Sequence, residues 1–433
     1  MSDAISRRTF VKATAAAGIA ASLASSRAYG ANERVRVGVI GVGNRGGQLI
    51  EAALPNPELE IVALCDVYEP YLAKWKEKVG GAVTTHRDYR ELLARNDIDA
   101  VIIATPEHWH ALQTIHACRA GKDVYVEKPL SYTVFEGRRI VEVAAETKRI
   151  VQVGLQRRSS KMYAEIRDFV QSGGIGKVTT ATCYRLSNMA PTGMGKSANS
   201  APPADLDWDL WLGPRPDRAF NETIAPYKFR WWSEYSSQTA NWGVHYFDLC
   251  RWIMGDLAPK SVVALGGRFA VDDMRSIPDT MHATMEFQKG WLMLFGQYEA
   301  SGSPIFADKS AEIEIRGTNG TLFANSVRYI VVPEKGGQFQ DPAERMQPLE
   351  NKGEDGDIVA KHIANFIACV KSRETPRVDA EEGHRSTTAA HLTNIALATR
   401  SVIDWDPVAE RITNNDTANE LLHYAYREPW FLG

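Results

Sequence analysis

The stretch Val35–Gly46, VRVGVIGVGNRG, decides the fold of the first half of the chain. Its opening residues, Val35–Ile40, form a short, nearly continuous apolar run, which is typical of a strand buried on both faces. Gly41, Gly43 and Gly46 follow with the spacing GxGxxG, and the residues after them are predicted to form a helix. In this context the first glycine permits a tight turn, the second lets the backbone approach a pyrophosphate, and the third lets the helix pack on the strand. The stretch therefore predicts a dinucleotide-binding turn with the positive end of a helix toward the phosphates.

A carboxylate after the next predicted strand indicates which dinucleotide is bound. The apolar run 60–64 is followed by Asp66, about 20 residues past Gly46, where a carboxylate can accept hydrogen bonds from the ribose hydroxyls of adenosine. A carboxylate at this position repels a 2′-phosphate. The sequence thus favours NAD as cofactor over NADP.

Strands and helices continue to alternate along the first half. Strands are predicted at 100–106, 123–129 and 150–156, with helices at 108–120 and 133–147 between them. This order predicts an α/β fold with an N-terminal Rossmann domain, a doubly wound parallel sheet. Ligands bind at the carboxyl ends of such strands. The residues predicted to contact the cofactor are Gly41, Gly43, Asn44, Arg45, Gly46, Asp66, Thr105, Pro106, His108, Glu127 and Lys128.

Lys128 is the first candidate for chemistry. It ends an apolar strand and precedes Pro129, which favours an extended backbone at Lys128. A lysine beside bound nicotinamide can contact the substrate hydroxyl that loses its proton as hydride leaves. Partial burial and the positive nicotinamide ring would lower its pKa toward the working range. The alternative is an ordinary salt bridge with Glu127.

The second half is predicted to form another α/β domain with a mixed or antiparallel sheet. The strand-like runs are 178–186, 261–268, 281–287, 291–297, 310–315 and 327–332, and two helices follow at 357–372 and 381–402. Between them the stretch 187–235 is too long for a simple connection, and loops of this length are usually functional or clamp a neighbour. The predicted division of the chain is a signal segment at 1–31, a Rossmann domain at 32–156 and a substrate and oligomerisation domain at 157–433.

The N-terminus has the pattern of an export signal. The stretch Ser6–Lys12, SRRTFVK, carries paired arginines and is followed by a weakly apolar run and small residues near Ala28 and Gly30. This is typical of a signal peptide of the twin-arginine route, so the export machinery is a predicted partner and the periplasm the predicted location. The run is too short and alanine-rich for an integral membrane span. The alternative is a basic, alanine-rich tail that arose by chance.

Composition narrows the function classes. The formal net charge is −3 and no long basic run follows the N-terminus, which argues against nucleic acid as a partner. The five cysteines are scattered, without a CxxC or Cys/His cluster, so no metal site and no disulfide framework is indicated. The eleven tryptophans either line a sugar-sized pocket or fill a large core.

Several segments resemble one family. The motifs GVGNRG, CDVYEP, TPEHWH and VYVEKPLS, together with 205–214, 229–252 and the terminal YREPWFLG, are similar to segments of the Gfo/Idh/MocA family, named for glucose–fructose oxidoreductase and inositol dehydrogenase. The resemblance covers nearly the whole chain after the signal segment. It implies a C-terminal α/β domain with a largely antiparallel open sheet that closes the active site and often mediates oligomers. A homodimer or homotetramer is therefore expected.

The resemblance also implies roles for particular residues. Lys128 matches the catalytic lysine of the family, and His245 matches its active-site histidine, a proton donor or acceptor for the reacting oxygen. Many members carry aspartate where this chain has Asn241, and an amide cannot take up a proton. Lys128 and His245 would therefore carry more of the acid–base work. The alternative for His245 is a structural helix histidine at an interface.

Further candidates stay open between a functional and a structural role. Asp248 either orients the His245 imidazole or faces solvent, and His110 matches a family position near the nicotinamide but could equally pack or cap its helix. Aromatic faces stack on sugar C–H surfaces, and Arg or Tyr can bond hydroxyls. The plausible sugar contacts are Arg157, Arg158, Tyr184, Tyr227 and Trp231.

Together these features predict an exported NAD-dependent oxidoreductase that acts on a sugar, glycoside or polyol. The periplasm holds no exchangeable NAD pool, so a tightly bound cofactor would have to be restored in place. Either one sugar is oxidised and another reduced, or a glycoside is oxidised, eliminated and re-reduced, as in a redox-neutral glycosidase. A non-catalytic sugar-binding protein and a dehydrogenase that is not exported are the remaining alternatives.

Overall fold

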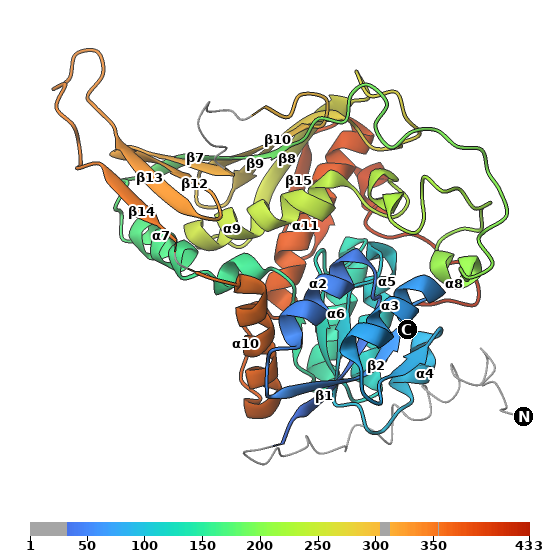
Figure 1. The fold of residues 1–433 in the computed structure, drawn as a ribbon. Helices are drawn as coiled ribbons and strands as arrows, with labels where there is room; N and C mark the ends of the chain where they lie inside the picture. Colours follow the sequence, from blue (N-terminus) through green and yellow to red (C-terminus); the bar gives the residue numbers. More distant parts are fainter. Residues whose placement is uncertain (1–32, 304–311, 354) are drawn as a thin grey trace, which may run out of the picture.

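The computed structural model describes residues 33–303, 312–353 and 355–433, and shows two lobes (Figure 1). The lower lobe contains the chain from Val35 to Val153, and the upper lobe contains a large sheet with helices on its lower side. The predicted signal segment, 1–31, lies outside the described residues. No helix in the described part is long and apolar enough to cross a membrane.

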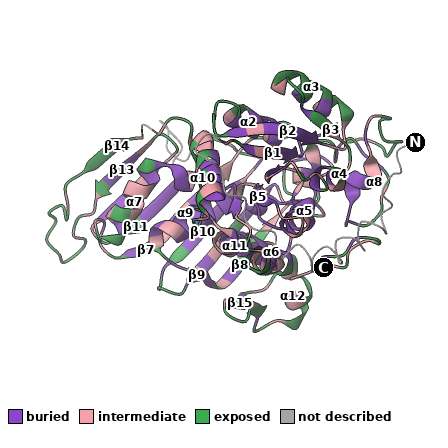
Figure 2. Cartoon of the chain, turned by 90° about the horizontal axis from the view of Figure 1, so that it is seen from below, coloured by how far each residue is buried: buried purple, intermediate pink, exposed green. Residues whose placement is uncertain are grey.

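The lower lobe is built on a parallel sheet. Its strand order is β3-β2-β1-β4-β5-β6, and every pair of neighbours is parallel. Strands β1, β4 and β5 are buried on both faces, as the apolar runs in the sequence predict, whereas the edge strand β3 is exposed or half-buried (Figure 2). This confirms the predicted Rossmann sheet. The strands are β1 (Val35–Ile40), β2 (Leu59–Cys65), β3 (Thr84–His86), β4 (Ala100–Ile103), β5 (Asp123–Val126) and β6 (Val151–Val153).

The helices of this lobe follow the strands in alternation. The strand order reverses between β1 and β4, and ligands of doubly wound sheets bind in the crevice at such a point. The turn after β1 and the ends of β4 and β5 therefore border the expected cofactor site. The helices are α2 (Asn44–Ala53), α3 (Glu69–Val79), α4 (Tyr89–Leu93), α5 (Glu107–Arg119) and α6 (Val134–Thr147).

A helix from late in the chain completes this lobe. Helix α10 (Ile358–Ser372) lies beside the parallel sheet in Figure 1. Its residues Ile363, Phe366 and Ile367 are fully buried in one core cluster with Val35 and Ile50. The hydrophobic effect therefore joins a C-terminal segment to the first core, although the two are more than 300 residues apart in the chain.

The upper lobe contains a second, mostly antiparallel sheet. Within the described residues it has ten strands in the order β14-β13-β12-β11-β7-β10-β9-β8-β15-β16, and β7 and β10 form a parallel pair. This agrees with the predicted mixed or antiparallel sheet. The strands are β7 (Val178–Leu186), β8 (Pro259–Gly267), β9 (Thr280–Phe287), β10 (Leu292–Tyr298), β11 (Ile313–Gly317), β12 (Gly320–Ala324), β13 (Arg328–Pro333), β14 (Leu349–Lys352), β15 (Ile403–Asp406) and β16 (Arg411–Ile412).

Helices cover the side of this sheet that faces the parallel sheet (Figure 1). They are α7 (Lys161–Gln171), α9 (Val244–Met254) and α11 (Ala380–Thr399), and the short α12 (Asp416–Glu420) follows near the C-terminus. In the described part of the chain no helix covers the opposite face. That face carries apolar side chains such as Leu265, which is 57% exposed.

The long stretch 187–235 runs from the upper sheet down the side of the lower lobe (Figure 1). It contains the short helix α8 (Trp208–Leu212), and its Trp211, Phe220 and Phe229 form a small core of their own. The amide of Glu69 at the start of α3 donates to the carbonyl oxygen of Asp205 at 3.0 Å. The stretch therefore clamps the side of the lower lobe where β2 ends.

Candidate active site

The glycine turn has the geometry of a phosphate cradle. Gly41 has φ +82°, and a Cβ added at Gly46 would lie 1.9 Å from the carbonyl oxygen of Gly41. The turn leads into the N-terminus of α2, where no described side chain caps the free amides. Uncapped amides at a helix N-terminus bind anions, since they carry a partial positive charge. The residues present therefore fit the pyrophosphate of a dinucleotide.

Asp66 lies at the end of β2 and holds this turn. Its carboxylate accepts hydrogen bonds from the amides of Val42 at 2.8 Å and Tyr68 at 3.0 Å. Burial raises the pKa of Asp66 to about 6, although both backbone bonds act in the opposite direction. The side chain lies next to the glycine turn, as the sequence predicts for a residue that contacts the adenosine ribose.

A cleft extends from the glycine turn over the ends of β2 and β4. Seven of the residues predicted to contact the cofactor line it, namely Gly41, Gly43, Asn44, Arg45, Asp66, Thr105 and Pro106. The opposite wall comes from the long stretch of the second half and includes Pro226, Tyr227, Phe229 and Arg230. The stretch that clamps the lower lobe thus also closes over the cofactor cleft, and it places Tyr227 at this cleft.

Glu127 binds Arg45 of the glycine turn. The guanidinium Nε of Arg45 donates to Glu127 Oε1 at 2.8 Å, and both side chains are largely buried. The other carboxylate oxygen accepts a long bond from the backbone amide of Lys128 at 3.3 Å. The salt bridge that the sequence left open for Lys128 is therefore formed by Arg45 instead.

The Lys128 amine points to neutral oxygens. Its Nζ donates to the backbone carbonyl oxygen of Asn241 at 2.6 Å and to the side-chain Oδ1 of the same residue at 3.0 Å. Burial lowers the pKa of Lys128 to about 8, while the nearby carboxylates of Glu127 and Glu107 oppose that shift. A lysine in this setting is partly neutral near physiological pH and can take up a proton.

His245 is the electrostatic neighbour of this lysine. It lies in the first turn of α9, 8% exposed, and its Nδ1 has no hydrogen-bond partner among the described residues. Burial, together with the positive charges of Lys128, Arg157 and Arg45, holds the pKa of His245 well below its usual value. The imidazole is therefore neutral. Asn241 lies in the π-helical turn Thr239–Gly243 immediately before α9, so the structure brings Lys128, Asn241 and His245 together.

Glu107 is an acidic neighbour of Lys128 that the sequence did not indicate. It begins α5 with 5% exposure, and the Ser236 hydroxyl donates to its Oε1. Its Oε2 is buried without a partner in the described part of the chain. Burial raises the pKa of Glu107 to about 7, against the opposing charges of Lys128 and Arg230. The segment TPEHWH signals this residue only as an acidic helix start, because its partner Ser236 is distant in sequence.

The two histidines of the same segment pack below the site. His108 is fully buried, and its Nε2 lies 2.9 Å from the carbonyl oxygen of Trp211 in α8, away from the lining of the cofactor cleft. The ring nitrogens of His110 lie 2.6 Å from the carbonyl oxygen of Pro129 and 2.9 Å from that of Thr105. His110 therefore ties the end of β4 to the turn that carries Lys128.

Asp248 and Arg158 belong to a buried ion network rather than to the reacting centre. The Arg158 guanidinium donates to both carboxylate oxygens of Asp248 at 2.7 to 3.1 Å, and the Ser386 hydroxyl donates to Asp248 at 2.7 Å. Arg158 also donates to Glu382 at 2.9 Å. Asp248, 1% exposed, thus neither bonds the His245 imidazole nor faces solvent, because Arg158 occupies both of its oxygens. Because Arg158 is bonded to Asp248 and Glu382, its guanidinium is not free to bind a sugar.

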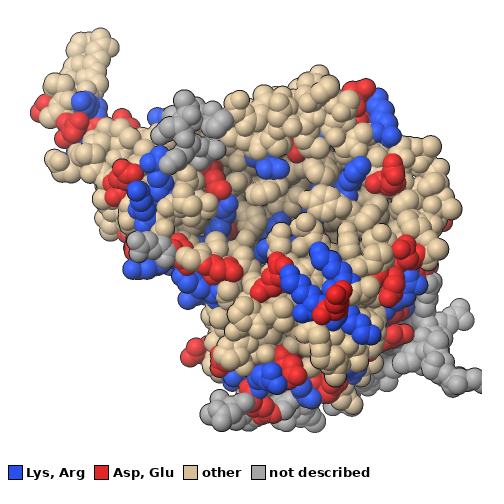
Figure 3. Space-filling view, viewed as in Figure 1, with Lys and Arg blue, Asp and Glu red and all other residues tan. Residues whose placement is uncertain are grey.

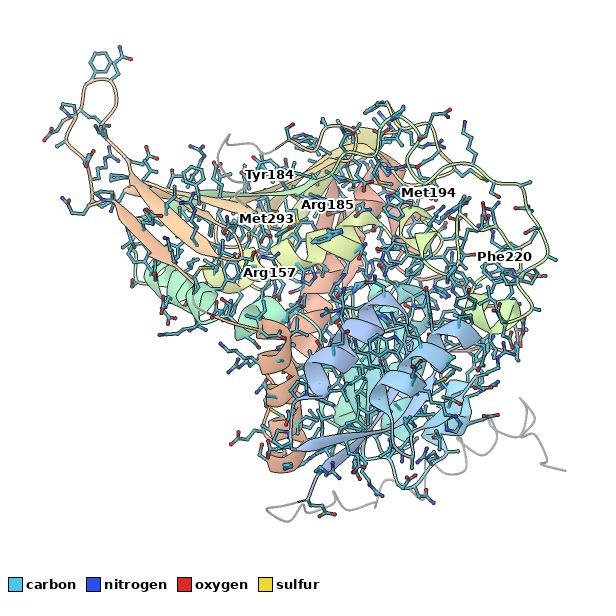
Figure 4. The ribbon with its side chains drawn as sticks, viewed as in Figure 1. Arg157, Tyr184, Arg185, Met194, Phe220 and Met293 are labelled. Carbon is cyan, nitrogen blue, oxygen red and sulfur yellow. The ribbon has the colours of Figure 1, made fainter. Side chains whose placement is uncertain are left out.

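Strand β7 places consecutive side chains on opposite faces of the sheet (Figure 4). Tyr184 lies at 6.3 Å from Tyr298 between ring centres, on the face without helices. Arg185 points to the helix side, where its guanidinium lies 4.3 Å from the ring centre of Trp242, next to Asn241. Arg185 therefore faces the candidate site and Tyr184 does not, which the period of two along a strand could have indicated.

Trp231 is fixed at the border of this region. Its indole nitrogen donates to Glu299 at 3.2 Å, and its ring is partly exposed.

Figure 3 shows a hollow between the two lobes with Lys and Arg atoms in its walls. The candidate site thus combines one partly neutral lysine, one neutral imidazole and several cationic side chains. Among the described residues no cluster of His, Cys, Asp and Glu could hold a metal ion.

Comparison with known proteins agrees with this geometry. Residues 35–155 match the model of an oxidoreductase family with an NAD-binding Rossmann fold, and residues 162–432 match the C-terminal α/β domain of the same family. The chain belongs to the Gfo/Idh/MocA oxidoreductase family. Its cofactor domain is thereby an NAD-binding domain, as the glycine turn and Asp66 predict.

Individual relatives of the chain differ from it at most of the matched positions. The chain is 25% identical to a myo-inositol 2-dehydrogenase of Thermotoga maritima over 86% of this chain and 99% of that protein. It is 36% identical to a glycosyl hydrolase family 109 protein of Solibacter usitatus over 34% of this chain and 38% of that protein. The structure resembles that of the WlbA dehydrogenase from Bordetella pertussis in complex with NADH and UDP-GlcNAcA, with a TM-score of 0.64 and 20% identity, over 86% of this chain and 99% of that chain. At this identity the structural likeness shows the fold alone.

Proposed function

We propose that this chain is an exported NAD-dependent oxidoreductase that acts on a sugar, glycoside or polyol. The observation that carries the proposal is the pairing of Lys128 with Asn241 beside the neutral His245, at the carboxyl end of β5. This is the edge of the parallel sheet where the cofactor cleft lies. A base at this point can act on a substrate hydroxyl next to the cofactor.

Lys128 is the proposed proton acceptor. Its neutral form takes the hydroxyl proton, and the carbonyl and amide oxygens of Asn241 hold the amine in place without supplying a negative charge. The pKa of about 8 leaves part of the population neutral at neutral pH, so the residue is ready to accept a proton without a separate activating carboxylate.

His245 is the proposed second ligand of the reacting oxygen. Because its pKa is held far below the usual value, it is neutral and can donate a hydrogen bond from one nitrogen and accept one with the other. Because the Asn241 amide cannot take up a proton, Lys128 and His245 are proposed to move the hydroxyl proton without it. Bound NAD supplies the hydride acceptor. Arg45, Asp66 and the glycine turn would hold it.

The proposed substrate class rests on the site and on the names of relatives. The helix side of the upper sheet presents Arg185 against the Trp242 ring, and an Arg beside an aromatic face suits hydroxyl groups and C–H surfaces of a sugar. One relative that matches over nearly its full length is named myo-inositol 2-dehydrogenase, and one solved structure of the same fold is in complex with NADH and UDP-GlcNAcA. These names support a carbinol carbon of a sugar or cyclic polyol as the site of oxidation.

A redox-neutral glycosidase is the second candidate. The glycosyl hydrolase family 109 relative is 36% identical over 166 residues, about a third of this chain, which supports this candidate for the part that it matches. Oxidation of the ring carbon two positions from the glycosidic carbon acidifies the C–H bond of the carbon between them, which permits elimination of the aglycone. Water would then add to the double bond before the ketone is reduced again, and Lys128 and His245 suit that proton chemistry. A non-catalytic sugar-binding role is disfavoured because both residues are kept in a reactive arrangement.

Export by the twin-arginine route and recycling of the bound cofactor are part of the proposal. The support is the sequence SRRTFVK at the N-terminus and the closure of the cofactor cleft by the long stretch that includes Tyr227 and Arg230. Denaturing the purified mature protein should release NAD. Turnover of sugars or aryl glycosides should then proceed without added nucleotide, whereas a strict need for external NAD would contradict recycling.

We also propose that the open face of the upper sheet joins copies of this chain into a dimer or tetramer. Leu265 on β8 is 57% exposed and Leu292 on β10 is 41% exposed, and apolar residues on an uncovered sheet face mark an interface. Light scattering should find a dimer or tetramer for the wild type and a smaller species for Leu265→Glu. A monomeric wild type would refute this assignment.

A further inference from the structure

A second cavity lies apart from the cofactor cleft. It measures about 520 Å³, counted as the space open to the centres of water-sized molecules, which is within the range of small-molecule sites. The N-terminus of α5, the residues before α6, the segment 233–240 and the second half of α11 contribute to its wall. The cavity adjoins the proposed reacting centre through Glu107 and Ala240, but neither Lys128 nor His245 lines it.

Two buried acceptors in its wall have no partner. Glu107 is 5% exposed and Gln238 is 1% exposed, yet Oε2 of the first and Oε1 of the second bond nothing in the described part of the chain. A buried polar atom without a hydrogen bond is costly, and native proteins rarely leave one unmatched. Both atoms therefore call for hydrogen-bond donors within the cavity.

The rest of the wall suits hydroxyl groups. Arg215 lies with its guanidinium carbon 4.7 Å from the ring centre of Tyr132 and 4.2 Å from that of Tyr424. Glu107 and Glu234 also line the cavity, so its wall carries charged groups of both signs and favours neither an anion nor a cation. Further hydrogen-bonding groups in the wall come from Ser233, Ser237, Thr239, Ser276, Gln297 and Asn394.

We propose that this cavity is a second binding site, which takes a small uncharged polyhydroxylated molecule whose hydroxyls donate to Glu107 Oε2 and Gln238 Oε1. The molecule is recognised by hydroxyl donors rather than by charge, and it fits alongside the aromatic and apolar part of the wall. The proposal goes beyond the oxidoreductase assignment, because binding here requires no turnover.

Contacts of the wall lead from this cavity to the candidate active site. The Thr239 hydroxyl donates to Asn394 Oδ1 at 2.6 Å, and the Asn394 amide donates to the Ser237 hydroxyl at 2.9 Å. The same segment continues into Asn241, which accepts the bonds from Lys128. A molecule in the cavity therefore contacts the segment that positions the proposed base.

The test measures binding without catalysis. The variant Lys128→Met, with its cofactor, is titrated calorimetrically with glycerol, sorbitol, D-glucose and myo-inositol as separate probes. At least one probe should bind. Glu107→Gln and Gln238→Leu, each made in the Lys128→Met protein, should weaken that binding by about tenfold or more, since the first replaces the free acceptor by a donor and the second removes it.

A matched control is Glu314→Gln, which changes a buried carboxylate on β11 outside this cavity and should leave binding unchanged. Thermal melting verifies that each variant is folded. The proposal is overturned if none of the probes binds, or if binding is unaffected by both substitutions, which would place the probe elsewhere. Either result is independent of turnover by the wild type, so the two proposals fail separately.

Discussion

The oxygens around Lys128 determine the proposed pH dependence. A carboxylate in the place of Asn241 would stabilise the ammonium, whereas an amide offers only a dipole. The amine is thus bonded to two neutral oxygens and largely desolvated, which lowers its pKa to about 8. Since only the neutral amine accepts a proton, oxidation should speed up as the pH rises through this value.

Asn241→Asp tests this relation. The new carboxylate should raise the pKa of Lys128, so the rising limb of the pH–rate profile should move to higher pH by about 1 to 3 units. The measurement is the rate of oxidation against pH. Asn199→Asp, which adds the same charge on an exposed loop, should leave the limb in place. An unchanged limb in Asn241→Asp would show that Lys128 is not the titrating base.

Some site residues could be predicted from the chain and others could not. Asp66 directly follows β2 and Lys128 comes two residues after the end of β5, so the sheet topology fixes their place at the edge where the cofactor is expected. Asp248 and Arg158 are 90 residues apart in the sequence and become neighbours only in the folded chain. No local pattern in a single sequence reveals such a pairing. Glu107 was missed for the same reason, because Ser236 becomes its neighbour only in the fold.

At the scale of elements, the glycine turn and α2 form one unit with the ends of β1 and β2. The bond between Asp66 and the Val42 amide joins the turn to β2, and Gly46 lies against the carbonyl oxygen of Gly41. This unit was predictable from local sequence because its spacing alone sets the close approach. The packing of α10 on the same lobe was not, since it depends on the burial of a distant amphipathic helix.

Gly46→Ala tests whether the close approach at this glycine is needed for NAD binding. Its Cβ would lie 1.9 Å from the Gly41 oxygen, so the turn must move and NAD binding should weaken by at least about tenfold. Equilibrium binding of NAD to protein stripped of nucleotide measures the effect. Gly337→Ala, where a Cβ meets no atom within 4 Å, is the matched control and should bind as the wild type does. Equal affinity of both variants would contradict the assigned role of Gly46.

Phe366→Ala should test the place of α10 in the lower lobe. The side chain is fully buried among residues of β1 and α2, so the substitution should lower the free energy of unfolding by about 3 to 5 kcal/mol. Denaturant unfolding measures the loss. Phe339→Ala, at a side chain that is 96% exposed, should change the same quantity by less than about 0.5 kcal/mol. A small loss in Phe366→Ala would mean that α10 contributes little to that core.

At the scale of the whole molecule, the two lobes and the stretch 187–235 share the proposed chemistry. The lower lobe supplies the cofactor cleft and Lys128, the upper lobe supplies His245 and Arg185, and the long stretch forms one wall of the cleft. A nucleotide enclosed in this way would travel with the folded protein during the proposed export. It would then be restored in place by the proposed recycling. The signal segment itself stays a prediction from the sequence.

The most direct test of the account is a single-turnover experiment on the purified protein with its bound cofactor. Sugars, inositols and aryl glycosides are mixed rapidly with the protein, and the near-ultraviolet absorbance of reduced nicotinamide is followed without added nucleotide. We expect a rise in absorbance with at least one substrate, and a rate lowered by a factor of about 10² to 10⁴ in Lys128→Met. No absorbance change with a compound that the protein converts, or an equal rate in Lys128→Met, would contradict it.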